Sequence, residues 1–75
     1  MTKETKKQIV EKLLPVIKLT REGASIKWLT YQDEGENGEY VYGFYELADG
    51  NHHFRIDVTA DSEISMIKDI CEHFA

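Results

Sequence analysis

The dipeptide Asp49-Gly50 separates two runs, 39–47 and 52–59, in which apolar and polar residues alternate. Alternation with period two is typical of β-strands, and Asp-Gly between two such runs favours a type I′ hairpin turn. A third run, 24–32, alternates in the same way. The three runs therefore predict an antiparallel meander of three strands.

The turn position predicts the register of each hairpin. With Asp49-Gly50 as the turn, Ala48 lies opposite Asn51, and Gly43 lies opposite Ile56. If the acidic segment 33–38 is the other loop, Gln32 lies opposite Glu39, and Trp28 also lies opposite Gly43. A residue without a side chain opposite the bulkiest one is consistent with a close-packed core.

These registers place aliphatic residues and Trp28 on one face of the sheet and aromatic residues on the other. The predicted cross-strand pairs of the aromatic face include Phe44 with Arg55 and Glu46 with His53. The full set on this face is Lys27, Leu29, Tyr31, Tyr40, Tyr42, Phe44, Glu46, His53, Arg55 and Asp57.

The segment before the strands has apolar residues at helical spacing, which predicts a helix from about Thr5 with a capping box formed by Thr5 and Gln8. Pro15 removes one backbone hydrogen bond and leaves two alternatives open. The helix continues with a kink to about Thr20 and Gly23 lies beyond its end, or it stops at Leu14 and residues 16–20 form an extra strand.

The C-terminal segment predicts a second helix, with Thr59, Asp61 and Ser62 as candidate caps. Its apolar stripe is expected at Ile64, Ile67, Cys71 and Phe74, flanked by Met66 and Ile70. Cys71 is expected to be a small buried hydrophobic residue.

The element order is α-β-β-β-α, which predicts an α+β fold with a three-stranded antiparallel meander packed on two helices. Residues 1–75 are expected to form a single domain, because a chain of 75 residues leaves no room for a second core. If both helices cover one face, the aromatic face is open. If they sandwich the sheet, it is a second core.

Composition excludes several function classes. One cysteine permits no internal disulfide and no cysteine-rich zinc module, and it favours a reducing compartment, the cytoplasm. No apolar run approaches the ~20 residues that span a bilayer, so no membrane association is expected. The formal net charge of −5 argues against nucleic acid as a partner.

The sequence also indicates no enzyme, cofactor or metal. It contains no phosphate-binding glycine loop, no nucleophile elbow and no zinc-binding helix motif. His52 and His53 point to opposite faces of a strand, so they cannot share one metal ion. Asp33, Asn37 and Gly38 match part of a calcium loop, but Phe44 occupies the position that requires glutamate.

The α-β-β-β-α order resembles that of double-stranded RNA-binding domains over nearly the whole chain, in topology alone. The resemblance implies phosphate contacts from a lysine-rich start of the second helix. Here the matching stretch is Thr59-Ala60-Asp61-Ser62-Glu63, which would repel phosphate. The alternative that remains is nucleic-acid binding through the basic first helix and its exit, with Lys3, Lys6, Lys7, Lys12, Lys18, Arg21 and Lys27.

The aromatic face is the most informative feature for function. Tyrosine and arginine are enriched at protein-binding hot spots. We therefore expect a non-enzymatic interaction or regulatory module that binds a protein partner, or a second copy of itself, through this face. A further alternative is a small acidic inhibitor of a larger protein, with the loop 33–38 contributing. The residues expected to carry binding are Tyr31, Tyr40, Tyr42, Phe44 and Arg55.

Overall fold

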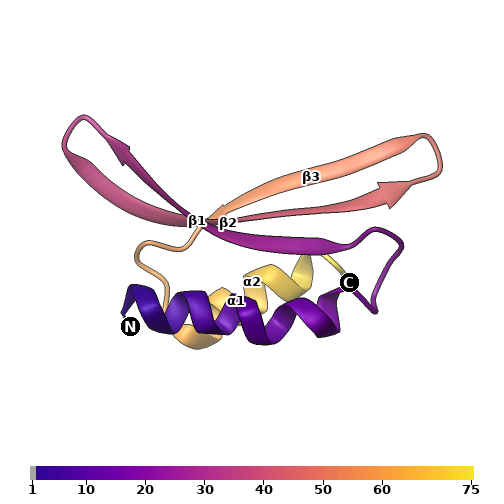
Figure 1. The fold of residues 1–75 in the computed structure, drawn as a ribbon, viewed down its shortest axis with the longest axis horizontal. Helices are drawn as coiled ribbons and strands as arrows, with labels where there is room; N and C mark the ends of the chain where they lie inside the picture. Colours follow the sequence, from indigo (N-terminus) through magenta and orange to yellow (C-terminus); the bar gives the residue numbers. More distant parts are fainter. Residues whose placement is uncertain (1) are drawn as a thin grey trace.

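The computed structural model describes residues 2–75 and confirms the predicted α-β-β-β-α fold (Figure 1). The elements are α1 (Lys3–Ile17), β1 (Ser25–Asp33), β2 (Glu36–Leu47), β3 (Gly50–Asp57) and α2 (Glu63–Glu72). The strands form one antiparallel sheet in the order β1-β2-β3, so β2 is central and β1 and β3 are edges.

Helix α1 runs through Pro15 and ends at Ile17, so residues 16–20 are not a strand. The amide of Lys18 still donates to the carbonyl of Leu14, and Ile17 is only 2% exposed. Burial of Ile17 in the core therefore keeps the helix continuous beyond the proline. The predicted capping box is wrong, since the cap is Thr2, whose hydroxyl accepts from the amide of Thr5.

Both predicted registers are wrong by two residues. In the first hairpin the strands continue to Asp33 and Glu36, and the turn is Glu34-Gly35, with φ angles of +49° and +85°. Positive φ at both central residues is the type I′ geometry, and a glycine at the second favours it. The predicted loop 33–38 is thus a tight turn with extra strand pairs on both sides.

The second hairpin turns at Ala48-Asp49 and pairs Leu47 with Gly50, so Asp49-Gly50 is not the central dipeptide. In this register Gly43 lies opposite Phe54. A methyl group added at Gly43 would collide with the Phe54 ring, so the glycine makes room for Phe54 and not for Trp28. Trp28 lies opposite Val41.

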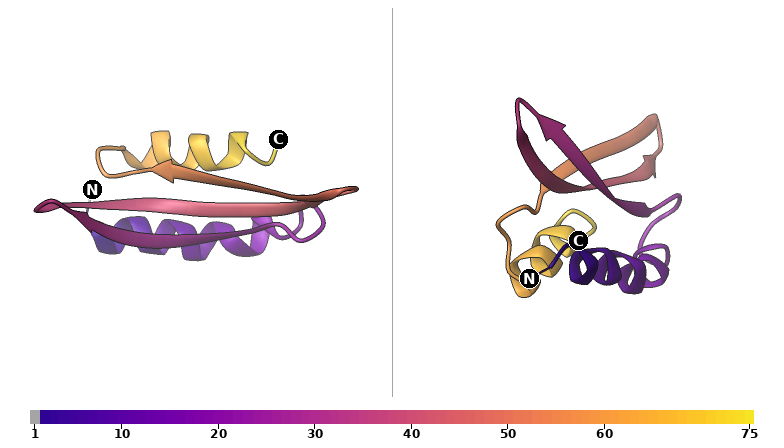
Figure 2. Two further views of the ribbon diagram at one scale, coloured as in Figure 1. Left: turned by 90° about the horizontal axis from the view of Figure 1, so that it is seen from above. Right: turned by 60° about the vertical axis from the view of Figure 1, so that its left-hand side comes forward.

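A slip of two residues preserves the side on which each side chain lies, because the pleat repeats every two residues. The predicted division of the sheet into two faces is therefore correct. Helices α1 and α2 lie side by side under the same face (Figure 2). The core between the helices and the sheet contains Val10, Ile17, Ala24, Ile26, Val41, Ile56, Val58, Met66, Ile70 and Phe74.

Helix α2 begins after Ser62, one of the three predicted caps, whose hydroxyl accepts from the amide of Ser65. Its predicted apolar stripe is correct at Phe74, but the flanking residues Met66 and Ile70 are buried in place of Ile64, Ile67 and Cys71. Met66, Ile70 and Phe74 are the buried residues, whereas Ile64 is 75% exposed and Cys71 is exposed. Cys71 is therefore not a core residue. Within residues 2–75, no helix is long and apolar enough to cross a membrane.

An ion pair is buried where α1 meets the sheet. The Lys6 ammonium lies 3.2 Å from Oε1 of Glu39 and donates to the carbonyl of Thr59 at 2.8 Å. Lys6 is 2% exposed and Glu39 is 5% exposed. The Thr59 hydroxyl and the Glu39 backbone bond to each other as well. This cluster ties α1, β2 and the start of the β3–α2 connection together.

Asp61 lies in the same connection, and one of its carboxylate oxygens is buried with no hydrogen-bond partner within residues 2–75. Burial raises the pKa of Asp61 above its ordinary value, and the negative charge of Asp69 raises it further. The nearby ammonium of Lys6 opposes these effects without cancelling them. Asp61 is therefore a carboxylate that the fold accommodates poorly when it is charged.

Candidate binding surface

The sheet face away from the helices carries all five residues expected to bind a partner. Both helices lie on the other side, and no other element within residues 2–75 covers this face (Figure 2). Tyr31, Tyr40, Tyr42 and Phe44 are partly exposed, and Arg55 is exposed. We call this surface the open face and define it by Lys27, Leu29, Tyr31, Tyr40, Tyr42, Phe44, His53, Arg55 and Asp57.

The observed register arranges the open face in rows that cross the three strands. The central row is Lys27, Tyr42 and Arg55, one residue from each strand. The rows on either side are Leu29-Tyr40-Asp57 and Ser25-Phe44-His53. Each row has an aromatic residue on β2 at its centre, so the rings follow one another along the middle of the sheet.

Tyr31 is held in place at the end of this series. It pairs with Gly38, and any side chain at Gly38 would collide with the Tyr31 ring, so the ring lies directly on the backbone of β2. The Tyr31 hydroxyl donates to Oδ2 of Asp57 at 2.8 Å. The other Asp57 oxygen accepts from the amide of Thr59 at 2.9 Å.

These contacts explain the titration of Asp57. Hydrogen bonds from Thr59 hold the pKa of Asp57 below its ordinary value, and the bond from Tyr31 and the positive charge of Arg55 lower it further. Asp57 therefore stays ionised, and remains an acceptor for Tyr31, at a lower pH than an ordinary aspartate.

Arg55 lies over aromatic rings and forms no salt bridge with a carboxylate within residues 2–75. Its guanidinium carbon is 3.8 Å from the centroid of the Tyr40 ring and 5.3 Å from that of Tyr31. This position corrects the predicted pairing of Arg55 with Phe44, whose partner across the strands is His53. A guanidinium stacked on rings loses little conformational freedom when it binds a ligand.

Tyr42 also has an intramolecular partner, since its hydroxyl hydrogen-bonds to Nδ1 of His53. The predicted pairing of His53 with Glu46 is wrong, because Glu46 pairs with Asn51. Aromatic contacts connect Tyr42 with Phe44, at 6.0 Å between centroids, and Tyr31 with Tyr40, at 6.2 Å. The open face is therefore a set of mutually supported side chains rather than independent ones.

Sequence reasoning placed Lys27 on this face but did not count it among the binding residues. The predicted registers already aligned Lys27 with Arg55, across Phe44, and the observed register keeps this alignment with Tyr42 between them. Lys27 and Arg55 form no salt bridge with any residue in the range 2–75. Two cationic residues without a salt bridge thus lie on the strands on either side of Tyr42, in a chain of net charge −5.

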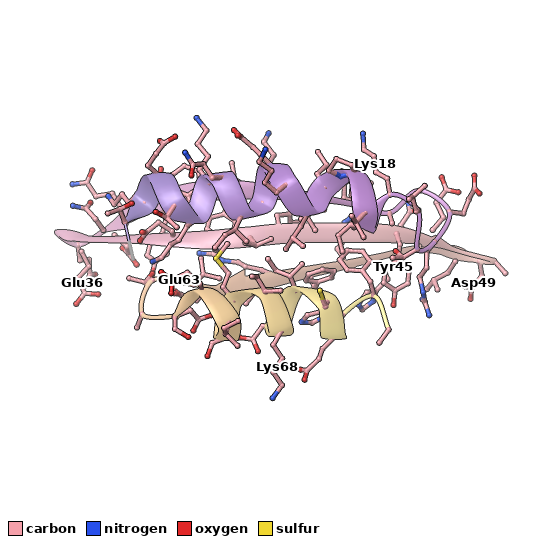
Figure 3. The ribbon with its side chains drawn as sticks, turned by 90° about the horizontal axis from the view of Figure 1, so that it is seen from below. Lys18, Glu36, Tyr45, Asp49, Glu63 and Lys68 are labelled. Atoms are coloured by element: carbon pink, nitrogen blue, oxygen red, sulfur yellow. The ribbon has the colours of Figure 1, made fainter. Side chains whose placement is uncertain are left out.

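The other candidate regions of the sequence are not assembled into sites. Glu36 and Asp49 lie at opposite ends of the sheet, at the tips of the two hairpins (Figure 3). No three His, Cys, Asp or Glu side chains within residues 2–75 are grouped so that they could hold a metal ion. Two shallow apolar grooves flank α1, one beside Ile67 of α2 and one beside Trp28 of β1.

The basic residues of α1 do not share one surface. Lys6 is buried in its ion pair with Glu39. Lys7 lines the groove beside β1, whereas Lys12 lines the groove beside α2. A phosphate backbone on either flank of α1 would therefore meet fewer lysines than the sequence suggests.

Comparison with protein-family models, curated proteins and solved structures finds no match to this chain. The functional interpretation therefore depends on the geometry of the chain itself.

Proposed function

We propose that this protein is a non-enzymatic interaction module that binds a protein partner through the open face. The observation that supports this most strongly is the uncovered series of partly exposed aromatic side chains along β2, flanked by Tyr31 and Arg55. Tyrosine rings offer large contact areas with few rotatable bonds, and arginine adds oriented donors.

The intramolecular contacts of the open face support the same proposal. Tyr31, Tyr42 and Arg55 already have fixed partners within the sheet. Binding then orders few additional side chains, and less free energy is lost to restricted rotamers. The reducing compartment expected from the single cysteine makes the cytoplasm our proposed location.

The test is an affinity pull-down from nuclease-treated lysate of the source cells with the Tyr42→Ser/Phe44→Ser variant. The matched control is Val16→Ser/Ile64→Ser, which removes two apolar side chains that are 58% and 75% exposed on the helices. We expect a protein that is captured by the wild type and by the control but not by the open-face variant. Equal capture by all three would contradict the proposal.

Self-association through the same face is the nearest variant of this function. Sedimentation velocity of the wild type and of the Tyr42→Ser/Phe44→Ser protein distinguishes it. A dimer that becomes a monomer on substitution identifies a second copy as the partner.

A further inference from the structure

The central row of the open face has a charge that differs from that of the molecule as a whole. The chain carries a net charge of −5, yet Lys27 and Arg55 occupy the strand positions on either side of Tyr42. The Arg55 guanidinium itself lies over the ring of Tyr40, in the neighbouring row. The nearest carboxylate of the adjacent row, Asp57, already accepts hydrogen bonds from Tyr31 and Thr59. We call Lys27, Tyr42 and Arg55 the basic row.

The donors of the basic row are available to a ligand. Both Lys27 and Arg55 are exposed, and neither forms a salt bridge within residues 2–75. Arg55 is held over the Tyr40 ring, with its guanidinium carbon 3.8 Å from the ring centroid, and its side chain donates no hydrogen bond within residues 2–75. Planar guanidinium groups bind carboxylates through two parallel hydrogen bonds.

We propose that the open face recognises an exposed acidic segment of another protein, and that a carboxylate of this segment binds at the basic row between Lys27 and Arg55. This inference rests on the proposed function of the open face and specifies the chemistry of the partner. The aromatic rings on either side, Tyr40 and Phe44, would contact the apolar parts of the same segment.

Charge complementarity favours an acidic protein segment over a nucleic acid. The hairpin tips carry Asp33, Glu34, Glu36 and Asp49. A strand rises about 3.3 Å per residue, so these tips, six or more residues away, lie roughly 20 Å or more from the basic row. This distance exceeds the ~10 Å Debye length at moderate salt. A partner's carboxylate bound at the basic row is therefore screened from the acidic side chains of the tips. An extended phosphate backbone along β2 would reach both acidic tips.

The test begins with selection of random short peptides, displayed on phage, on the immobilised wild-type protein. Selected peptides are then measured by fluorescence anisotropy against the charge-reversed variant Lys27→Glu/Arg55→Glu. The matched control is Lys12→Glu/Lys18→Glu, which makes the same change in net charge on α1. Circular dichroism establishes that each variant is folded before binding is measured.

We expect the selected peptides to be rich in Asp and Glu, with about tenfold weaker binding to Lys27→Glu/Arg55→Glu and unchanged binding to the control. Peptides in which the acidic residues are replaced by lysine should bind the charge-reversed variant. This exchange of charges distinguishes direct contact from a structural effect of the substitutions.

Different failures separate the inference from the proposed function. Peptides that require Tyr42 and Phe44 but bind equally well to Lys27→Glu/Arg55→Glu overturn the inference and leave the proposed function standing. Peptides that do not require Tyr42 and Phe44 contradict both. If no peptide is selected, the inference is overturned and the pull-down alone decides the proposed function.

Two further measurements test whether the basic row binds RNA or a second copy of this chain instead. A fluorescein-labelled RNA duplex that binds the wild type but not Lys27→Glu/Arg55→Glu, with a steep decrease at higher salt, would assign the row to phosphate and overturn the inference. A wild-type dimer that the same substitutions dissociate would assign it to the acidic hairpin of a second copy, with the same consequence.

Discussion

The two faces of β2 are built from alternate residues of one strand, and they differ in what holds their side chains. On the core face, Val41 is fully buried and Gly43 is covered by the Phe54 ring, so packing fixes each position. On the open face, Tyr40 and Tyr42 keep part of their surface in water and are fixed by Arg55 and His53. Side chains on the core face are therefore positioned by close packing. Those on the open face are positioned by a cation–π contact and a hydrogen bond.

In a small sheet, a side chain can therefore be held in a fixed position without being fully buried. An aromatic residue on the open face is positioned without the free-energy gain of full burial. Its loss should therefore affect recognition more than folding, whereas the reverse holds for the core face. The following predictions test this separation, beginning with the largest effect.

The largest effect is expected at the buried ion pair of the core face. Lys6→Met leaves the Glu39 carboxylate, which is 5% exposed, without its cation. We expect a loss of about 3–5 kcal/mol in the free energy of unfolding, measured by urea denaturation. The double variant Lys6→Met/Glu39→Leu should recover most of that loss, because no charge remains buried. A stable single variant would show that Glu39 reaches water.

The same substitution on the two faces of β2 compares the faces directly. Tyr45 packs against Phe74, with 5.8 Å between ring centroids, and carries Arg21 over its ring at 4.4 Å. Tyr45→Ser is expected to cost roughly 2–4 kcal/mol, whereas Tyr42→Ser on the open face is expected to cost less than ~1 kcal/mol. Thermal denaturation of both variants measures this, and equal losses would end the distinction between the faces.

A smaller loss of stability is expected from adding a side chain at Gly43. Gly43→Ala places a methyl group against the Phe54 ring, which also stacks on His73 at 4.0 Å between centroids. We expect a cost of about 1–3 kcal/mol in urea denaturation, because the ring has to move within a packed layer. The second substitution Phe54→Leu should restore part of the stability. No loss for Gly43→Ala would contradict the observed pairing of Gly43 with Phe54.

The smallest effects are expected at two carboxylates with opposite pKa shifts. Because the pKa of Asp57 is lowered in the folded state, its contribution is present above the ordinary carboxyl pKa of 3.8 and is lost as the pH falls through the lowered value. Asp57→Asn should therefore decrease the melting temperature at neutral pH, and the difference should vanish in acid.

Asp61 behaves in the opposite way. Its folded pKa is raised, so its favourable contribution is complete only below the ordinary value of 3.8 and is lost as the pH rises through the raised value. Asp61→Asn should increase the melting temperature at neutral pH. Melting curves of both variants at neutral and acidic pH provide the comparison, and shifts of the same sign at neutral pH would refute it.

The fold was predictable because its strongest signals are periodic. The order of elements and the content of each face follow from alternation, and both survive a slip of two residues in each hairpin. The turn positions were not predictable from Asp49-Gly50 alone. Phe54 fits over Gly43 only in the slipped register, and that is a packing effect between distant residues.

The buried ion pair was missed, although a signal for it exists. Glu39 lies on the same side of β2 as Val41, and Lys6 precedes Val10 by one helical turn on the core side of α1. Two opposite charges at core positions of different elements indicate a pair. The sequence of helix α2 does not indicate which face is buried, because its apolar residues form two possible stripes. Packing against the sheet selects the stripe that contains Met66 and Ile70.

All five binding residues predicted from the sequence lie on the open face, because that prediction required only the side of the strand. In the central row, the alignment of Lys27 with Arg55 was predictable because both hairpins slip by the same two residues, whereas Tyr42 in place of Phe44 between them required the observed register.

The burial of Lys6 has a chemical consequence. Its amine is held by Glu39 and by the carbonyl of Thr59, while Lys3, Lys7, Lys12 and Lys18 of the same region are exposed. Acetylating reagents should therefore modify those four lysines quickly and reach Lys6 only when α1 separates from the sheet. The rate of Lys6 labelling then reports how often this junction opens under native conditions.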